Sequence, residues 1–207
     1  MMKRAITKRM SVAAVGGVLL AGVAGAAFAE EQVGDGNDVD VSVTIEDANP
    51  GVLAMSVAGT SSALAEDGST ATVRQFTGTL PTVTVTDTRT AEEIPDGAYW
   101  WVEGTASAFT GDAGQAPIGA ENLGWVPALL NDDGSGAVAE GDNVAPALDE
   151  TEAPNNVGLE GRELLAMAVT SEEAIGSWQA NAGLVLQVPV DTAPGSYSST
   201  LTLSLFE

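Results

Sequence analysis

The stretch that decides the fold is Tyr197-Ser198-Ser199-Thr200-Leu201-Thr202-Leu203-Ser204-Leu205-Phe206. From Leu201 onward, leucines alternate with small polar residues, so that Tyr197, Leu201, Leu203 and Leu205 lie on one face. Side chains in a β-strand point to opposite faces in turn, and alternation of this kind is typical of a strand with one buried face. The sequence therefore predicts a half-buried strand at Tyr197 to Phe206.

The same period of two appears upstream of this stretch. Gly183 to Val188 alternates apolar and other residues, and Pro189 to Gly195 reads as a linker with Pro194-Gly195 at its tip. Val39 to Glu46 alternates four apolar with four polar residues, and the turn-forming Asp47 to Gly51 follows it. Further strands are predicted at Val52 to Val57 (the return strand of a hairpin), Ala71 to Phe76, Thr79 to Thr86 and Ala98 to Glu103.

Many short alternating runs between Gly, Pro, Asn and Asp turns indicate an all-β protein. We expect a β-sandwich with Ig-like, Greek-key connections and long acidic loops rich in Gly and Pro. Thr110 to Gly161 has weak periodicity apart from Asn122 to Leu130, and it predicts long loops and short strands, a place for insertions or local disorder. A helical turn is expected near Ser171 to Ile175, with Ser171 as its cap.

The N-terminal segment has the pattern of a secretory signal peptide. Four basic residues precede an apolar or small stretch from Val12 to Phe28, and Ala27-Phe28-Ala29 supplies small residues at a cleavage site. We expect cleavage after Ala29; the alternative is a retained anchor, although 17 residues are short for a spanning helix. Residues 30–38 read as a flexible leader and residues 39–207 as a single domain.

The charge of the expected mature chain is strongly negative. Three arginines against 29 acidic residues leave a net charge of −26 after residues 1–29. Such a field repels phosphate backbones and anionic lipids, so neither nucleic acid nor a membrane is an expected partner after cleavage. We expect a secreted, extracellular protein.

The residue types that are missing restrict the chemistry. Beyond residue 29 the chain has no His, Cys or Lys. Catalytic triads with histidine, Schiff bases, thiolate or imidazole metal sites and disulfides are therefore excluded. Paired carboxylates could still hydrolyse a glycosidic bond, but no local motif marks one pair. The sequence predicts a protein that is not an enzyme, with no catalytic residues and no cofactor.

Aromatic residues are the candidates for ligand contact, because aromatic rings stack on the faces of sugars. The chain has four tryptophans, and core packing is the expected role for most of them. Trp100 and Trp101 would point to opposite faces of a strand, so at most one of them lies in a given core. The tryptophans are Trp100, Trp101, Trp125 and Trp178.

The C-terminal half, from about residue 80 to residue 207, resembles the WxL domain family of Gram-positive surface proteins. That family has a Trp-x-Leu motif and a later motif of the form Tyr-x-x-x-Leu-Thr-Trp-x-Leu. Residues 197–205 match the spacing and ending of the later motif, but Leu203 replaces its tryptophan. For the first motif, Trp101-Val102-Glu103 has Glu in place of Leu and Trp125-Val126-Pro127 has Pro.

The resemblance implies a β-sandwich that attaches non-covalently to the cell wall, by binding peptidoglycan or another envelope protein. The resemblance adds Tyr197 and Leu203, which occupy positions of the later motif, to the aromatic candidates. Candidate wall or glycan contacts are therefore Trp100, Trp101, Trp125, Tyr197 and Leu203.

Two acidic loops have the oxygen ligands that Ca²⁺ prefers, although neither has EF-hand spacing. They are residues 35–40 and Asn131 to Gly136, and solvated turns with at most weak cation binding are the expected reading. Arg89 follows a predicted strand amid many acids, and a structural salt bridge is its expected role.

Three functions remain open at this point. The leading expectation is a non-catalytic binding protein of the cell surface. The alternative is a structural subunit or adhesin that assembles through sheet edges into a filament or array. The third is a glycosidase that uses two carboxylates.

Overall fold

The computed structural model describes residues 42–43 and 50–207. From Pro50 onward these residues form antiparallel strands, joined by turns and by two short 3-10 helices, η1 (Ala120–Asn122) and η2 (Glu150–Glu152). The prediction of an all-β protein is confirmed. The finer assignment to an Ig-like sandwich stays a prediction.

The larger sheet is organised by one long strand, β10 (Gly176–Pro189). The first part of β10 pairs with β4 along one edge and its later part pairs with β3, while β7 pairs along the other edge. The strand order is β1-β4-β10-β3-β2, with β7 attached to β10. The bounds are β1 (Leu53–Val57), β2 (Ala65–Glu66), β3 (Val73–Thr79), β4 (Val83–Asp87) and β7 (Leu123–Leu129).

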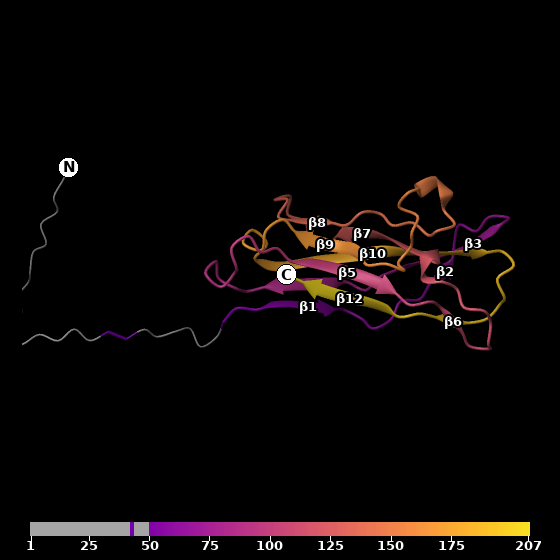
Figure 1. Cartoon of the computed structure of the whole chain (residues 1–207), viewed down its shortest axis with the longest axis horizontal. Helices are drawn as coiled ribbons and strands as arrows, with labels where there is room; N and C mark the ends of the chain where they lie inside the picture. The colour runs from indigo at the N-terminus through magenta and orange to yellow at the C-terminus, as the bar shows by residue number, and fades with distance from the viewer. Residues whose placement is uncertain (1–41, 44–49) are drawn as a thin grey trace, which may run out of the picture. The chain divides into compact units, whose positions relative to one another are not determined.

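The second sheet has four strands in the order β12-β5-β9-β8. A small ribbon of β6 and β11 lies beyond the start of β12 (Figure 1). The bounds are β5 (Trp101–Ala106), β6 (Thr110–Gly111), β8 (Val138–Glu140), β9 (Glu163–Ala168), β11 (Tyr197–Ser198) and β12 (Leu201–Phe206).

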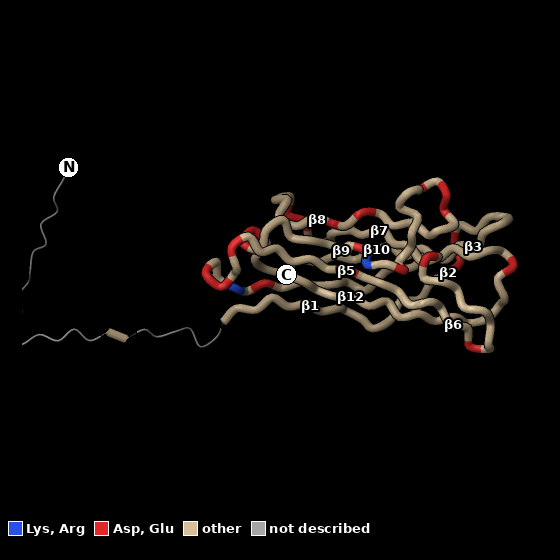
Figure 2. Tube along the Cα trace, viewed as in Figure 1, with Lys and Arg blue, Asp and Glu red and all other residues tan. Residues whose placement is uncertain are grey.

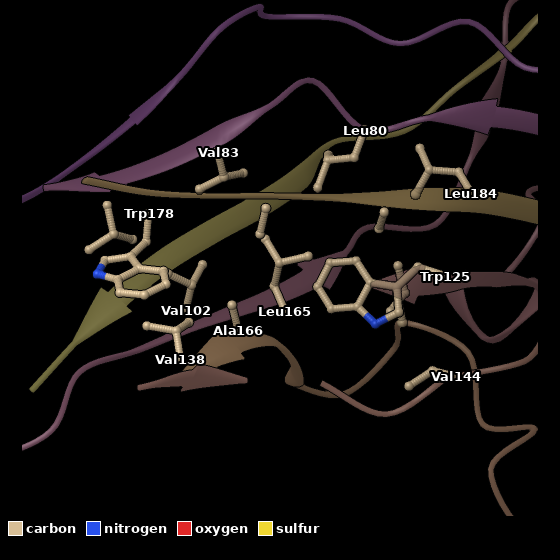
Figure 3. Packing of buried hydrophobic residues seen from close by; sticks show 14 of the residues in the cluster. Leu80, Val83, Val102, Trp125, Val138, Val144, Leu165, Ala166, Trp178 and Leu184 are labelled. Atoms are coloured by element: carbon tan, nitrogen blue, oxygen red, sulfur yellow. The ribbon is translucent and has the colours of Figure 1, made fainter. Parts of the chain in front are cut away.

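Side chains from both sheets form one hydrophobic core. Figure 3 shows Trp178 and Trp125 on either side of Leu165 of β9 within this core. Leu165 is fully buried, and burying a leucine side chain contributes roughly 1.5–3 kcal/mol to folding.

The alternation of leucines in β12 confirms the predicted half-buried strand, with one correction. Leu201, Leu203 and Leu205 pack against the core, as expected. The predicted single strand is interrupted at Ser199-Thr200, because these residues bond to Ser107 instead of continuing a ladder. The backbone N–H of Thr200 donates to Ser107 Oγ at 3.0 Å, and Ser199 Oγ donates to the Ser107 carbonyl at 2.6 Å.

Other predicted strands are present with shifted bounds. The predicted strand at Thr79 to Thr86 starts four residues late, at Val83, because β3 ends at Thr79 and Pro81 separates the two strands. The strand predicted at Gly183 to Val188 is the second half of β10. Its first half continues the buried alternation through Trp178, Ala180 and Ala182.

The region from Thr110 to Gly161 consists of loops and short strands, as predicted, and it also contributes side chains to the core. Trp125, Val138 and Leu159 of this region are buried in the common core. The segment Ser171 to Glu173 is a single turn, and its cap also differs from the prediction. Thr170 Oγ1 accepts the backbone N–H of Glu173 at 3.3 Å.

The predicted signal peptide, the leader and most of the predicted strand at Val39 to Glu46 lie outside the described residues. Leu53 to Val57, expected as the return strand of a hairpin, is β1 and pairs with β4. Residues from Pro50 onward belong to one compact unit, Glu46–Glu207. Among the residues that the structure describes, no helix has the length and apolarity to cross a membrane.

Candidate binding surface

The four tryptophans, all in the described part of the chain, divide into three core residues and one surface residue. Trp100, Trp125 and Trp178 are 1%, 0% and 8% exposed. Trp101 is half-buried on the outer face of the four-stranded sheet. Trp100 precedes β5 and points inward, so the prediction that the two adjacent tryptophans face opposite ways is confirmed.

Three aromatic rings gather on this outer face, and we call Tyr99, Trp101 and Phe206 the aromatic ledge. The ring centroids of Trp101 and Phe206 are 5.4 Å apart, with an interplanar angle of 21°. Those of Tyr99 and Trp101 are 5.3 Å apart, with an angle of 32°. Tyr99 is 44% exposed, so the ledge presents aromatic surface to solvent.

The register of β5 and β12 brings two of these rings together. Phe206 lies directly opposite Trp101 in the antiparallel ladder. Cross-strand neighbours of this kind stand about 4.5–5.5 Å apart at Cβ, close enough for their rings to stack. The strand alternation that directs the leucines of β12 inward directs Phe206 outward, and Tyr99 joins because it lies two residues before Trp101. Met167 of β9 lies opposite Trp101 on its other side.

Charged groups border the ledge. Trp101 Nε1 donates to Glu103 Oε1 at 3.1 Å, and the Arg162 guanidinium lies 5.5 Å from the Phe206 ring centroid. Arg162 Nη1 is 3.9 Å from Glu103 Oε2, and its side chain is 71% exposed. An exposed ion pair at this distance contributes little to stability, so the guanidinium is available to a ligand.

Glu163 adds a second carboxylate near Glu103. Burial raises the pKa of Glu163 above its ordinary value, and the negative charge of Glu103 raises it further. The surface therefore combines aromatic rings, a cation and two carboxylates. Aromatic rings stack on the apolar faces of sugars, while carboxylates and guanidinium bond hydroxyl and amide groups.

The structure does not bring the other predicted contact residues to the ledge. Trp100 and Trp125 are buried and have no surface to offer to a ligand, so their assignment as contacts was wrong. Tyr197 and Leu203 pack against the core from the inner face. The hydroxyl of Tyr197 donates to the Ala193 carbonyl at 2.7 Å.

Sequence reasoning missed Phe206 and Tyr99 as members of the ledge. A signal was present, because Phe206 occupies the polar face of the alternation Thr202, Ser204, Phe206, where a large aromatic is out of place. Its proximity to Trp101 could not be found without the strand register.

A second surface feature is an apolar groove of about 390 Å³ between β1 and β12. Both strands contribute residues to its lining, and no ladder in the described part of the chain joins them. Apolar side chains line the groove, with serine and threonine residues among them. Its lining includes Met55, Val57, Ser61, Leu64, Leu201 and Leu203.

Acidic residues lie mostly in loops and at the ends of the sheets (Figure 2). In the predicted cation loop at Asn131 to Gly136, Asp132 and Asp133 accept backbone N–H groups of Gly134 and Ser135, both at 2.9 Å. Hydrogen bonds from Ser135 lower the pKa of Asp133. Across residues 50–207, no group of three or more acidic side chains is arranged to hold a metal ion. The other predicted loop, residues 35–40, lies outside the described residues.

The predicted structural salt bridge of Arg89 is confirmed. Arg89 Nη2 is 2.7 Å from Asp87 Oδ2 and also 2.7 Å from Glu207 Oε1. The side chain of Asp87 is fully buried and that of Arg89 is 10% exposed. The pair therefore belongs to the folded framework rather than to the ledge.

No family model, no curated protein and no solved structure matches this chain. Its resemblance to the WxL domain family stays a prediction.

Proposed function

We propose that this protein is an exported, non-catalytic binding protein of the bacterial cell surface, and that the aromatic ledge attaches it to cell-wall glycan. The observation that carries this proposal is the stacked pair of Trp101 and Phe206 on an outer sheet face, extended by the exposed ring of Tyr99.

The chemistry around the rings supports glycan as the ligand class. Sugars of a wall polymer present apolar C–H faces beside hydroxyl and amide groups. The ledge supplies rings for the former, while Glu103 and Arg162 supply an acceptor and donors for the latter. Stacking is worth about 0.5–1.5 kcal/mol for each ring pair, so several rings are needed for useful affinity.

The expected mature chain supports binding rather than catalysis, since it lacks histidine, cysteine and lysine. The N-terminal pattern supports export. Mass measurement of the protein recovered from culture medium or cell walls tests that part directly: cleavage after Ala29 is expected, and a cytosolic protein that retains residues 1–29 would overturn it.

Co-sedimentation with purified cell-wall sacculi tests the ledge. Removing one stacked ring in Trp101→Ala should weaken retention up to about tenfold, the equivalent of 1.4 kcal/mol. The matched control is Ile175→Ala, which removes a 44% exposed apolar side chain outside the ledge. Equal retention of wild type, Trp101→Ala and Ile175→Ala would reject the ledge as the contact.

Sedimentation and glycan-release assays also distinguish two alternative functions from wall binding. Sedimentation without walls, through self-assembly, favours a structural subunit, and the open groove between β1 and β12 is the observation behind that alternative. Release of soluble sugars from a glycan panel, lost in Glu103→Gln or Glu163→Gln, would instead show a glycosidase that uses this carboxylate pair.

A further inference from the structure

The apolar groove between β1 and β12 is deep enough to reach the hydrophobic core. Its floor is formed by Leu80, Phe109, Leu123 and Leu184, which are at most 9% exposed and belong to the core cluster. Packed protein interiors contain few voids larger than a water molecule, whereas this hollow measures about 390 Å³. Sites for small molecules are concave, mostly apolar spaces of roughly 300–1,000 Å³. The groove therefore has the size and depth of a small-molecule site.

Hydroxyl groups gather around the mouth of the groove. Thr60, Ser61 and Ser62 lie in the loop after β1, and Ser199 and Thr200 precede β12; all five residues are more exposed than the floor. A hydroxyl group can both donate and accept a hydrogen bond. A ligand in this groove would thus find an apolar surface at the floor and partners for one polar end at the mouth.

Hydrogen bonds to neighbouring segments hold both sides of the mouth. On the side of β1, Ser62 Oγ donates to the Thr79 carbonyl at 2.8 Å. On the side of β12, Ser199 Oγ donates to the Ser107 carbonyl at 2.6 Å, and the backbone N–H of Thr200 donates to Ser107 Oγ at 3.0 Å. A site that is already formed loses little conformational freedom when its ligand binds, so less of the interaction energy is spent on ordering.

The lining of the groove carries no charge, and this restricts the class of ligand. Among the described residues that line it, none is acidic or basic. An ion buried in such a space without a partner is strongly disfavoured. The expected mature chain holds 29 acidic residues against three arginines, so its field also repels anions. The groove therefore favours an uncharged ligand over a carboxylate of the same shape.

We propose that the groove binds one small uncharged molecule, whose apolar body packs on the floor and whose hydroxyl or carbonyl end meets the hydroxyl groups at the mouth. Aliphatic alcohols represent this class. The site is separate from the aromatic ledge, because Leu201 and Leu203 of β12 face the groove and the core, whereas Phe206 stacks on Trp101 at the outer face of the sheet. The proposal does not depend on wall binding.

Titration of the mature chain, residues 30–207, with the uncharged fluorophore N-phenyl-1-naphthylamine tests the site. We expect a saturable rise in probe fluorescence, with one molecule bound per chain. Decanol should displace the probe. Decanoate has the same chain length but a negative charge, so it should need an at least about tenfold higher concentration. Equal displacement by decanol and decanoate would overturn the uncharged class.

A charge at the mouth tests where the probe binds. Ser61→Asp introduces a carboxylate into the lining and should lower the probe affinity at least about tenfold, because the apolar site would then have to accommodate an ion. The matched control is Ser56→Asp, which adds the same charge at an exposed position of β1 outside the lining. This control should bind the probe as wild type does.

Bulk at the mouth tests the same location without a charge. A Cβ at Gly59 would meet only Pro81, at 3.5 Å, so a larger side chain fits there and its ring would occupy the groove. Gly59→Phe should therefore lower the probe affinity at least about tenfold, the equivalent of 1.4 kcal/mol. Ala58→Phe, at an exposed neighbouring position outside the lining, is the matched control. Circular dichroism confirms that each variant keeps its β-spectrum.

Three further results would each overturn the proposal. The first is the absence of saturable probe binding by the mature chain. The second is equal affinity in each variant and its matched control. The third is loss of the probe in Trp101→Ala, which would place the probe on the ledge. Wall retention gives a separate readout, because Ser61→Asp should be retained on sacculi as wild type is, whether or not it binds the probe.

Discussion

Arg89 and Glu207 form a two-point ion pair between the loop after β4 and the residue that follows β12. Arg89 Nη1 lies 2.8 Å from Glu207 Oε2, and Nη2 lies 2.7 Å from Oε1. The same guanidinium donates twice to Asp87, and Ser171 Oγ donates to Glu207 Oε1 at 2.9 Å. This network ties both sheets to the turn before β10.

Removing the arginine should strongly destabilise the fold. In Arg89→Ala the buried carboxylate of Asp87 loses its cation, and breaking such a pair costs about 3–5 kcal/mol. The unfolding free energy of Arg89→Lys should lie between those of wild type and Arg89→Ala, because lysine keeps the charge but lacks the planar guanidinium fork. Urea unfolding measures the change. Arg74→Ala, which removes the exposed pair with Glu66, is the control and should change the unfolding free energy little.

Acid should weaken the fold partly through Glu207. The hydrogen bonds from Arg89 hold the pKa of Glu207 below its ordinary value of 4.5. A lowered folded-state pKa stabilises the fold above the unfolded value, and this contribution disappears as pH falls through the folded value. Unfolding free energy should therefore fall less steeply below pH 4.5 in Glu207→Gln than in wild type. Parallel curves for the two proteins would contradict this, and Glu173→Gln, an exposed site, serves as the control.

Gly104 should tolerate no larger side chain. A Cβ at this position of β5 would lie 2.6 Å from the Trp125 ring and 3.2 Å from Leu203. Overpacking of this kind costs about 1–3 kcal/mol, so Gly104→Ala should lower the thermal midpoint. The matched control is Gly183→Ala in β10, where a Cβ meets nothing within 4 Å. If both variants melt together, the close packing of Trp125 on β5 is wrong.

Fluorescence should distinguish the ledge from the core. Trp101 is the half-buried tryptophan, while the other three are at most 8% exposed. Acrylamide should quench a component of the emission that disappears in Trp101→Phe and persists in Trp178→Phe. Wall fragments that stack on the ledge should protect the same component. Quenching that is unchanged in Trp101→Phe would place the accessible ring elsewhere.

Several features followed from the sequence alone. The alternation at Leu201 to Leu205 identified both the strand and its inward face, because the side-chain period of a strand leaves one face for the core. The same rule separated Trp100 from Trp101. The isolation of Arg89 among acids predicted its salt bridge, since a cation in such a field finds a carboxylate. The all-β class also followed from the sequence, because it depends on the same local alternation of side chains.

Only the tertiary structure decided which strands are neighbours, and the candidate site depends on that. Phe206 meets Trp101 because β12 pairs with β5 in one register. The two residues are separated by 104 residues in sequence, and no local pattern predicts that their strands pair. The region from Thr110 to Gly161 reads as loops, yet it delivers Trp125 and Leu159 to the core, since irregular backbone can bury a side chain without any period. Local alternation sets which way a side chain points, whereas long-range pairing sets what it meets.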